Sequence, residues 1–160
     1  MGKKIKVLFV CMGNICRSPT AHGVFQHLVN EAGIAKQIFV DSAGTHAYHV
    51  GESPDRRAQK TATKRGFDLS KIKARRVDVN DFEEFDYILA MDRDNYRHLE
   101  AKCPDKHKPK IQLFLEFAPY YGDTEVPDPY YGGQNGFELV LDMVDAAANG
   151  LLAHIQSRDL

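Results

Sequence analysis

Residues 11–18 combine the residue types that chemistry on a phosphate group requires. The segment begins with Cys11 and ends with Arg17 and Ser18, and it separates an apolar run from a segment with helical spacing. A thiolate next to positive charge is an activated nucleophile, so Cys11 could attack a bound phosphorus atom. Arg17 offers a planar fork of donors that matches two phosphate oxygens. We therefore expect a loop that holds a phosphate above a nucleophilic cysteine.

The backbone of the same loop could bind the remaining phosphate oxygens. A loop that leads from a strand into a helix can point successive N–H groups at one anion. Gly13 supplies conformational freedom, and Asn14 tolerates left-handed geometry. Ser18 could donate a hydrogen bond to the sulfur when it becomes a leaving group. The residues expected to contact phosphate are Met12, Gly13, Asn14, Ile15, Cys16 and Ser18.

Strands and helices that alternate along the chain would position this loop. Four apolar runs are predicted to be buried strands of a parallel sheet: Ile5–Val10, Ile38–Ser42, Tyr87–Met91 and Ile111–Phe117. Helical spacing and capping residues predict the helices between and after them: Pro19–Ala32, with Ser18 as its N-cap, Pro54–Arg65, Asp92–Lys102 and Gly136–Gln156. The expected fold class is therefore α/β. We predict a single doubly wound domain over residues 1–160, with helices on both faces of a four-stranded parallel sheet and a phosphate-binding loop after the first strand.

A candidate general acid follows the last strand. In a parallel α/β sheet the ligand lies at the carboxyl ends of the strands. The loop after the fourth run carries Asp128 with a proline on each side, which stiffens the chain there. Asp128 could give a proton to the leaving oxygen of a phosphate ester. Tyr130 and Tyr131 could form the walls of a slot for an aromatic leaving group.

Four segments, in this order, closely resemble the low-molecular-weight protein tyrosine phosphatases: Val10–Pro19, Asp41–Thr45, Phe85–Asp92 and Val126–Tyr130. The resemblance implies hydrolysis of phosphotyrosine, an aryl phosphomonoester, through a cysteinyl-phosphate intermediate. Cys11 would be the nucleophile and Asp128 the general acid and then the general base. Arg17 and the loop amides would supply the electrostatic stabilisation that a metal supplies elsewhere, so no metal or other cofactor is expected.

The resemblance also implies supporting roles around the loop. Asn14 and Ser42 would shape the loop through hydrogen bonds beside Ser18. Cys16 would form a reversible disulfide with Cys11 under oxidation and so protect the nucleophile.

Two further positions match the family, and one does not. Asp92 matches a carboxylate near the site, to which we assign no role from the sequence. Tyr48 lies near a position where many members have tryptophan, and it would form an aromatic wall beside the slot. Vertebrate members have a histidine near residues 70–74, where this chain has Lys71, Ile72 and Lys73, so statements about that histidine do not transfer.

Composition and charge limit the classes of partner and the cellular compartment that we expect. The net charge of -1 gives no overall field that would attract nucleic acid or an anionic membrane, and no apolar stretch is long enough to span a bilayer. Three cysteines do not suit a secreted disulfide framework, and the first apolar run is too short for a signal peptide. We expect a cytoplasmic enzyme whose partner is a phosphotyrosine-containing protein or peptide, with no nucleic acid and no membrane. It would be a monomer, or self-associate weakly through its tyrosines.

Other functions stay open from the residues alone. An arsenate reductase would share this fold and cysteine loop, but it would need further cysteines near residues 80–90, where the chain has none. A phosphotyrosine-binding module without turnover would keep Arg17 but would not need both Cys11 and Asp128. A phosphatase for small phosphomonoesters would use the same groups.

Two features outside the loop have an ordinary interpretation and a functional one. His46 and His49 could begin a metal site, but no third ligand accompanies them, so we expect exposed loop histidines. A basic run could be a solvated face or a rim that attracts acidic phosphopeptides: Lys71, Lys73, Arg75 and Arg76.

Overall fold

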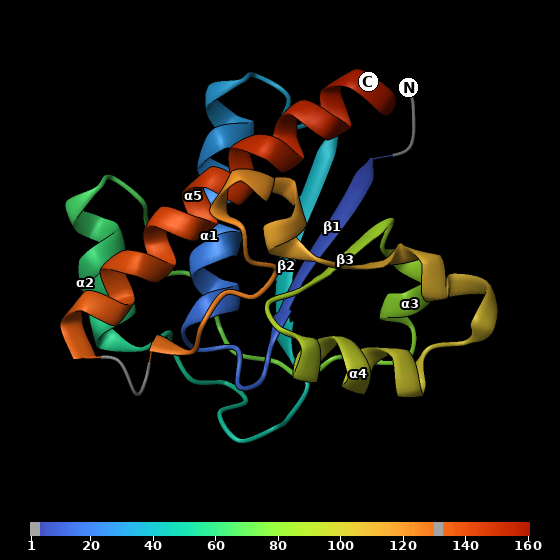
Figure 1. Cartoon of the computed structure of the whole chain (residues 1–160), viewed down its shortest axis with the longest axis horizontal. Coiled ribbons are helices and arrows are strands. Elements are labelled where there is room, and N and C mark those ends of the chain that lie inside the picture. Colours follow the sequence, from blue (N-terminus) through green and yellow to red (C-terminus); the bar gives the residue numbers. More distant parts are fainter. Residues whose placement is uncertain (1–3, 130–132) are drawn as a thin grey trace.

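A computed structural model describes residues 4–129 and 133–160 of the chain. Its centre is a parallel sheet of four strands in the order β2-β1-β3-β4, as predicted (Figure 1). The strands are β1 (Ile5–Cys11), β2 (Ile38–Gly44), β3 (Tyr87–Ala90) and β4 (Ile111–Leu113).

The fourth strand is shorter than predicted, which corrects the expected range Ile111–Phe117. Residues Phe114–Phe117 form the 3-10 helix η2 instead. Phe114 and Leu115 are both fully buried in the same core cluster. Successive residues of a strand point to opposite faces of the sheet, so a strand could not bury both in one cluster.

Four long helices correspond to the predicted ones: α1 (Arg17–Glu31), α2 (Arg56–Lys64), α4 (Arg93–Lys102) and α5 (Gly133–Arg158). The short helix α3 and two 3-10 segments were not predicted: α3 (Asp81–Glu84), η1 (Asp105–Lys110) and η3 (Pro119–Tyr121). The predicted N-cap of the first helix was wrong, because α1 already begins at Arg17 and Cys16 occupies the cap position without a side-chain hydrogen bond. The last residues of the phosphate loop therefore belong to the first helical turn.

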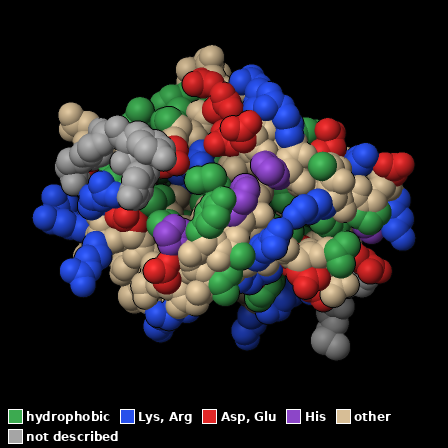
Figure 2. Space-filling model, turned by 90° about the horizontal axis from the view of Figure 1, so that it is seen from below, with side chains coloured by type: hydrophobic (Ala, Val, Ile, Leu, Met, Phe, Trp, Pro, Cys, Tyr) green, Lys and Arg blue, Asp and Glu red, His purple; other side chains and the backbone are tan. Residues whose placement is uncertain are grey.

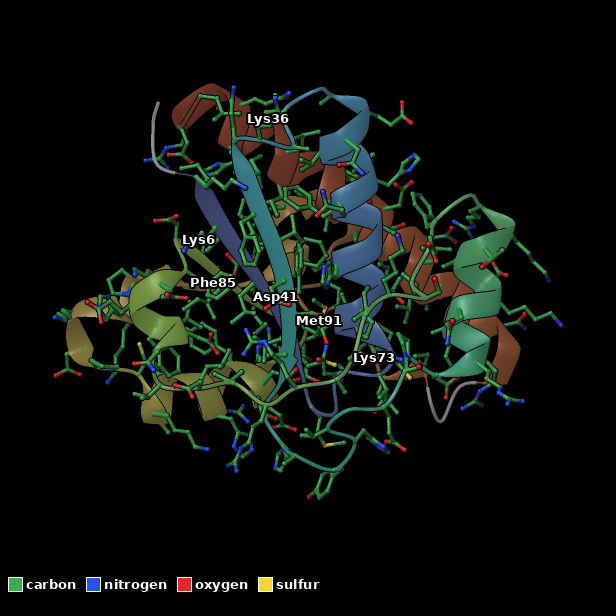
Figure 3. The ribbon with its side chains drawn as sticks, turned by 180° about the vertical axis from the view of Figure 1, so that it is seen from behind. Lys6, Lys36, Asp41, Lys73, Phe85 and Met91 are labelled. Carbon is green, nitrogen blue, oxygen red and sulfur yellow. The ribbon has the colours of Figure 1, made fainter. Side chains whose placement is uncertain are left out.

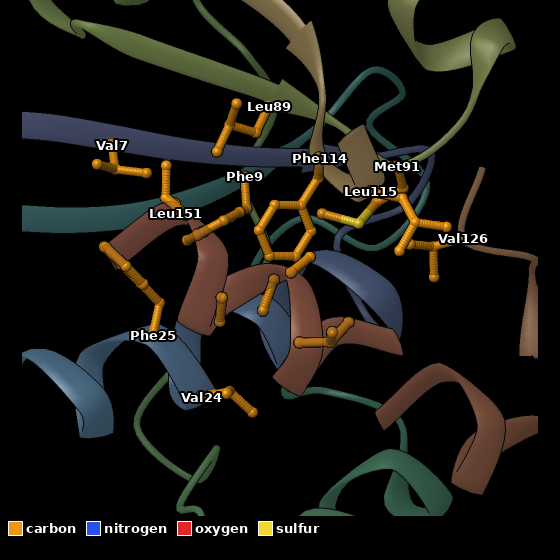
Figure 4. Close-up of a cluster of buried hydrophobic side chains, with 14 of the residues drawn as sticks. Val7, Phe9, Val24, Phe25, Leu89, Met91, Phe114, Leu115, Val126 and Leu151 are labelled. Atoms are coloured by element: carbon orange, nitrogen blue, oxygen red, sulfur yellow. The ribbon is translucent and has the colours of Figure 1, made fainter. Parts of the chain in front are cut away.

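Helices cover both faces of the sheet, as the sequence predicted. Alternate residues of β1 point to opposite sides: Phe9 faces α1 and α5, whereas Leu8 and Val10 face α3 and α4. On the first side, the ring of Phe9 makes edge-on contacts with Phe25 and Phe114, at centroid distances of 5.7 and 5.0 Å (Figure 4). Packing on both faces thus fixes the position of β1 and the direction in which the chain leaves the sheet at its end.

Helix α5 packs against η2 at a glycine. A Cβ atom on Gly150 would lie 1.9 Å from the backbone oxygen of Phe117. No side chain fits at that distance, so the glycine inside this helix permits close approach of two backbones.

The carboxyl ends of the strands share one edge of the sheet. In Figure 3, Lys36 lies at the amino end of β2, and Asp41 lies further along the strand toward the opposite edge. Figure 2 looks onto that opposite edge, where hydrophobic and histidine side chains gather between basic and acidic ones. None of the helices in the described ranges is long and apolar enough to cross a membrane.

Candidate active site

Asn14 shapes the loop between β1 and α1. Its φ of 58° is left-handed, and its side chain is fully buried. Its Oδ1 accepts a hydrogen bond of 3.0 Å from the backbone N–H of Arg75, and its Nδ2 donates one of 2.8 Å to Ser18 Oγ. The left-handed residue is thus Asn14, and its amide links Ser18 at the end of the loop to the segment that carries Arg75.

Main-chain contacts hold the loop against the end of β2. The carbonyls of Cys11 and Met12 accept hydrogen bonds from the N–H groups of Thr45 and His46, at 2.9 and 3.0 Å. A Cβ atom on Gly44 would lie 2.7 Å from the Met12 oxygen, so the close approach requires glycine there.

The N–H groups of the loop point to no acceptor among the residues that the structure describes. Across the described part of the chain, no residue accepts a hydrogen bond from the backbone N–H groups of residues 12–18. Unpaired donors at the start of a helix form a binding site for an anion. The loop therefore has the carbonyls of Cys11 and Met12 bonded to the end of β2, while its N–H groups are available to a ligand.

Cys11 lies next to the hydroxyl of Ser18. The two atoms Sγ and Oγ are 3.0 Å apart, and both side chains are buried. Because Asn14 donates to Ser18 Oγ, the hydroxyl proton of Ser18 can point at the sulfur. When Cys11 is a thiolate, Ser18 must be the donor of this hydrogen bond.

Asp92 holds the guanidinium of Arg17. Arg17 Nη1 donates to Asp92 Oδ2 at 2.6 Å and to the carbonyl of Val126 at 3.0 Å. Asp92 also caps α4, because its Oδ1 accepts from the N–H of Asn95 at 2.8 Å. Among the described residues, every hydrogen bond of Arg17 uses Nη1, so Nε and Nη2 are available to a ligand. Asp92, whose role the sequence left open, thus orients the arginine.

The charge of Arg17 is stabilised by its neighbours. Burial opposes the charge, but the Cys11 sulfur and the Asp92 carboxylate outweigh it and raise the pKa of Arg17 above its ordinary value. A guanidinium held in this way is a fixed positive charge at the end of the loop.

One cavity brings most of the predicted site residues together. It has a volume of about 210 Å³ and is lined by Cys11, Met12, Gly13, Ile15, Cys16, Arg17, Tyr48, His49 and Asp128. The side chains of Asn14 and Ser18 are fully buried and do not line the cavity, and Asp92 contacts it only through Arg17. Tyr130 and Tyr131 lie outside the described residues.

Asp128 reaches the cavity from the segment after η3. The N–H of Val126 donates to the carbonyl of Met91 at 2.8 Å, which ties this segment to the end of β3. Pro129 is buried, and it contacts the first turn of α5, where a Cβ on Gly136 would lie 3.3 Å from its oxygen. Asp128 is therefore held from both sides, at the same edge of the sheet as Cys11.

Ser42 has a different partner from the one expected. Its hydroxyl shares a hydrogen bond of 2.9 Å with His22 Nδ1, and no described contact joins it to Ser18. Burial lowers the pKa of His22; the charge of Asp41 opposes this shift and that of Arg75 adds to it. His22 was not singled out in the sequence, because a lone histidine in a helix gives no signal of its partner.

Arg75 belongs to the scaffold and not to a free basic rim. Its guanidinium forms ion pairs of 3.0 Å with Asp41 and with Asp81. These ion pairs fix the position of Arg75, whose backbone N–H donates a hydrogen bond to Asn14 Oδ1. From the same run, Lys73 donates to Ser53 Oγ at 2.9 Å.

Cys16 packs away from the solvent. Burial, and next the charge of Asp55, raise its pKa to about 12. Cys11 and Cys16 are both free in the structure. Cys16 is therefore a neutral thiol at physiological pH, unlike a residue that serves as a nucleophile.

His46 and His49 each contact another side chain close to them in the chain. His49 Nδ1 contacts Glu52 Oε2 at 2.5 Å, and His46 stacks on Tyr48. Both are partly buried, which is more than the sequence suggested. No group of three or more ligating side chains occurs in residues 4–129 and 133–160.

Comparison with known proteins gives one consistent family. Residues 6–159 match the family model described as low molecular weight phosphotyrosine protein phosphatase. A Schizosaccharomyces pombe protein of the same description is 44% identical over 153 residues, which cover 94% of this chain and 97% of the relative.

Solved structures agree in fold. A protein tyrosine phosphatase from Entamoeba histolytica, with Hepes in its active site, has a TM-score of 0.93 and 42% identity and covers 98% of this chain and 100% of its own. A Drosophila structure named an arginine phosphatase has a TM-score of 0.89 and 34% identity, with coverage of 97% and 100%. The same fold thus occurs in a protein named a tyrosine phosphatase and in one named an arginine phosphatase.

Proposed function

The chain belongs to the low-molecular-weight protein tyrosine phosphatase family, and from that membership and the cavity we propose that it hydrolyses phosphotyrosine with Cys11 as nucleophile. The observation that carries the proposal is the loop itself. Its sulfur lies beside a hydroxyl donor, its N–H groups have no acceptor among the described residues, and Arg17 is fixed at its end. Such a set of donors suits the equatorial oxygens of a phosphoryl group.

In the first step, the Cys11 thiolate attacks phosphorus, so that a P–S bond forms as the P–O bond to the aryl group breaks. Arg17 and the N–H groups of residues 12–18 hold the equatorial oxygens throughout. Asp128, which lines the same cavity, donates its proton to the leaving phenolate oxygen.

In the second step, water attacks the cysteinyl phosphate. Asp128, now a carboxylate, takes a proton from the water, and the P–S bond breaks to release inorganic phosphate. Ser18 donates its hydrogen bond to the sulfur as negative charge returns to it. The cycle ends with Cys11 as a thiolate and Asp128 protonated.

We further propose that the reaction needs no metal ion. The positive charge that phosphoryl transfer requires comes from Arg17, whose raised pKa keeps it charged, and from the loop amides. Tyr48, which lines the cavity and stacks on His46, provides an aromatic wall for an aryl leaving group. We place the substrate in a phosphotyrosine-containing protein or peptide and the enzyme in the cytoplasm. It acts there as one domain, a monomer or a weak self-associate.

The test is hydrolysis of p-nitrophenyl phosphate in the presence of EDTA. Cys11→Ser should abolish turnover, whereas the matched variant Cys103→Ser, at another buried cysteine that does not line the cavity, should retain it. Asp128→Asn should lose about 100-fold or more on aryl phosphates with poor leaving groups and much less on good ones. Equal losses across leaving groups would reject Asp128 as the acid, and EDTA-sensitive turnover would reject the metal-free mechanism.

The leaving group needs a separate test, because one similar structure is named an arginine phosphatase. Initial rates on a phosphotyrosine peptide and a phosphoarginine peptide of otherwise equal sequence give the comparison. The aromatic wall at Tyr48 favours phosphotyrosine. Faster release of phosphate from phosphoarginine would contradict the proposed substrate and leave the cysteine mechanism intact.

A further inference from the structure

The aromatic wall of the cavity continues into helix α4. Tyr48 stacks on His46 with centroids 5.2 Å apart and planes 6° apart. His98 of α4 meets His46 edge-on at a centroid distance of 5.0 Å. Thr45 Oγ1 and His46 Nδ1 share a hydrogen bond of 2.8 Å, which fixes the middle ring. The three rings therefore form one row that leads out of the cavity.

Basic side chains surround the outer end of this row. His98 and Lys102 lie four residues apart on α4, so they share one face of the helix. Arg76 approaches from the segment that pairs with Gly44 at the end of β2. Burial lowers the pKa of His46, and the neighbouring His98, Arg76 and Lys102 lower it further. We call Arg76, His98 and Lys102 the cationic shelf; Figure 2 shows histidines next to Lys or Arg side chains on this face.

The shelf has no carboxylate partner among the described residues. All three of its side chains are exposed, and none of them forms an ion pair with a described Asp or Glu. Nearby arginines differ, because Arg93 pairs with Glu125 and Arg97 pairs with Asp94. In a chain whose net charge is -1, positive charge is thus left unbalanced beside the mouth of the cavity.

We propose that the cationic shelf binds an acidic side chain that flanks the phosphotyrosine of the substrate protein. The proposal rests on the proposed function and names its substrate class, an acidic phosphotyrosine segment. The two centroid steps of 5.2 and 5.0 Å mean that the ring of His98 lies no more than about 10 Å from that of Tyr48. An extended peptide covers this span in about three residues. A glutamate or aspartate one to three positions from the phosphotyrosine can therefore reach the shelf.

The expected effect is moderate and sensitive to salt. The shelf is exposed, and exposed charge pairs are weak and screened by ions. Two or three such pairs together correspond to a preference of roughly 3- to 10-fold at low ionic strength. The preference should shrink as salt is added, because the charges act at the rim of the site.

Binding to the Cys11→Ser protein tests the proposal without turnover. Fluorescence anisotropy would give the dissociation constants of two labelled phosphotyrosine peptides, one with flanking glutamates and one with glutamines at the same positions. The test variant adds Arg76→Gln and Lys102→Gln. The control variant adds Lys4→Gln and Lys36→Gln, which remove the same charge just before β1 and β2 begin, at the far edge of the sheet.

We expect the glutamate peptide to bind roughly 3- to 10-fold tighter at low salt, with the preference lost in the test variant and kept in the control. Equal binding of both peptides, or equal loss in the two variants, would overturn the proposal. Hydrolysis of p-nitrophenyl phosphate by the protein with Cys11 intact reports the proposed reaction separately. If hydrolysis fails but the glutamate preference is found, the reaction is wrong and the shelf remains.

Discussion

Removal of the Ser18 hydroxyl tests how the loop assists the reaction. Ser18 Oγ lies 3.0 Å from Cys11 Sγ and accepts a hydrogen bond of 2.8 Å from Asn14 Nδ2. In Ser18→Ala, the sulfur loses a charge-assisted hydrogen bond worth about 1.5–3 kcal/mol. Since about 1.4 kcal/mol is a factor of ten in rate, the breakdown of the cysteinyl phosphate should slow by roughly 10- to 100-fold.

The same change also affects folding, so it needs a matched control. Asn14 is fully buried, and the loss of its acceptor should cost about 1–3 kcal/mol of unfolding free energy. Thr20 provides the control, because its hydroxyl donates to the carbonyl of Cys16 at 2.7 Å, one turn away from the sulfur. Thr20→Val keeps that carbonyl bonded to the Thr20 N–H at 3.2 Å, so it should cost about 1 kcal/mol and leave the rate unchanged.

Stopped-flow release of p-nitrophenol separates the two steps. If the second step is slowed, Ser18→Ala should release a burst that matches the enzyme concentration, followed by a slow steady phase. Thr20→Val should behave as the wild type does. Ser18→Ala with the wild-type steady rate, or slowed without a burst, would refute this role of the hydroxyl.

Three further predictions follow from buried groups. Burial lowers the pKa of His22, so the unfolded chain takes up this proton at higher pH than the folded one. Stability should therefore fall as the pH drops below about 6.5, and less so in His22→Gln; parallel curves from urea denaturation at several pH values would contradict this. Gly150→Ala should cost more than about 2 kcal/mol in the same assay, because its Cβ would meet the Phe117 backbone, and a neutral change would show that α5 can shift. Iodoacetamide near neutral pH should leave Cys16 unmodified in peptide maps, because burial and Asp55 raise its pKa to about 12; a label there would be inconsistent with this environment.

The local pattern of the sequence was sufficient to predict the sheet and most helix positions. Runs of β-branched residues and helical spacing depend on burial, and the structure buries those residues. Many element boundaries differ from the predicted ones, and two of these differences have a physical reason that the structure shows. Ser18 resembles an N-cap, but in the structure it is the second residue of α1, and its hydroxyl faces Cys11 and Asn14. The fourth strand ends early because Phe114 and Leu115 enter the same core.

The groups that hold the site together were harder to predict. The motif from Cys11 to Ser18 is contiguous, so its chemistry can be inferred from residue types. By contrast, Arg75 reaches Asp41 across 34 positions of the chain, and the carbonyl of Val126 contacts Arg17 across 109. A carbonyl is present at every residue and gives no signal in a sequence. Such contacts depend on the topology of the sheet and become apparent only in three dimensions.

Trapping of the intermediate tests the central claim most directly. The Asp128→Ala protein, mixed with p-nitrophenyl phosphate and quenched after the first turnover, should carry one phosphoryl group. Peptide mapping by mass spectrometry should locate that group on the Cys11 sulfur, and it should be absent when Cys11→Ser is added. A phosphoryl group on another residue, or turnover by the wild type with no adduct in any quenched sample, would contradict Cys11 as the nucleophile.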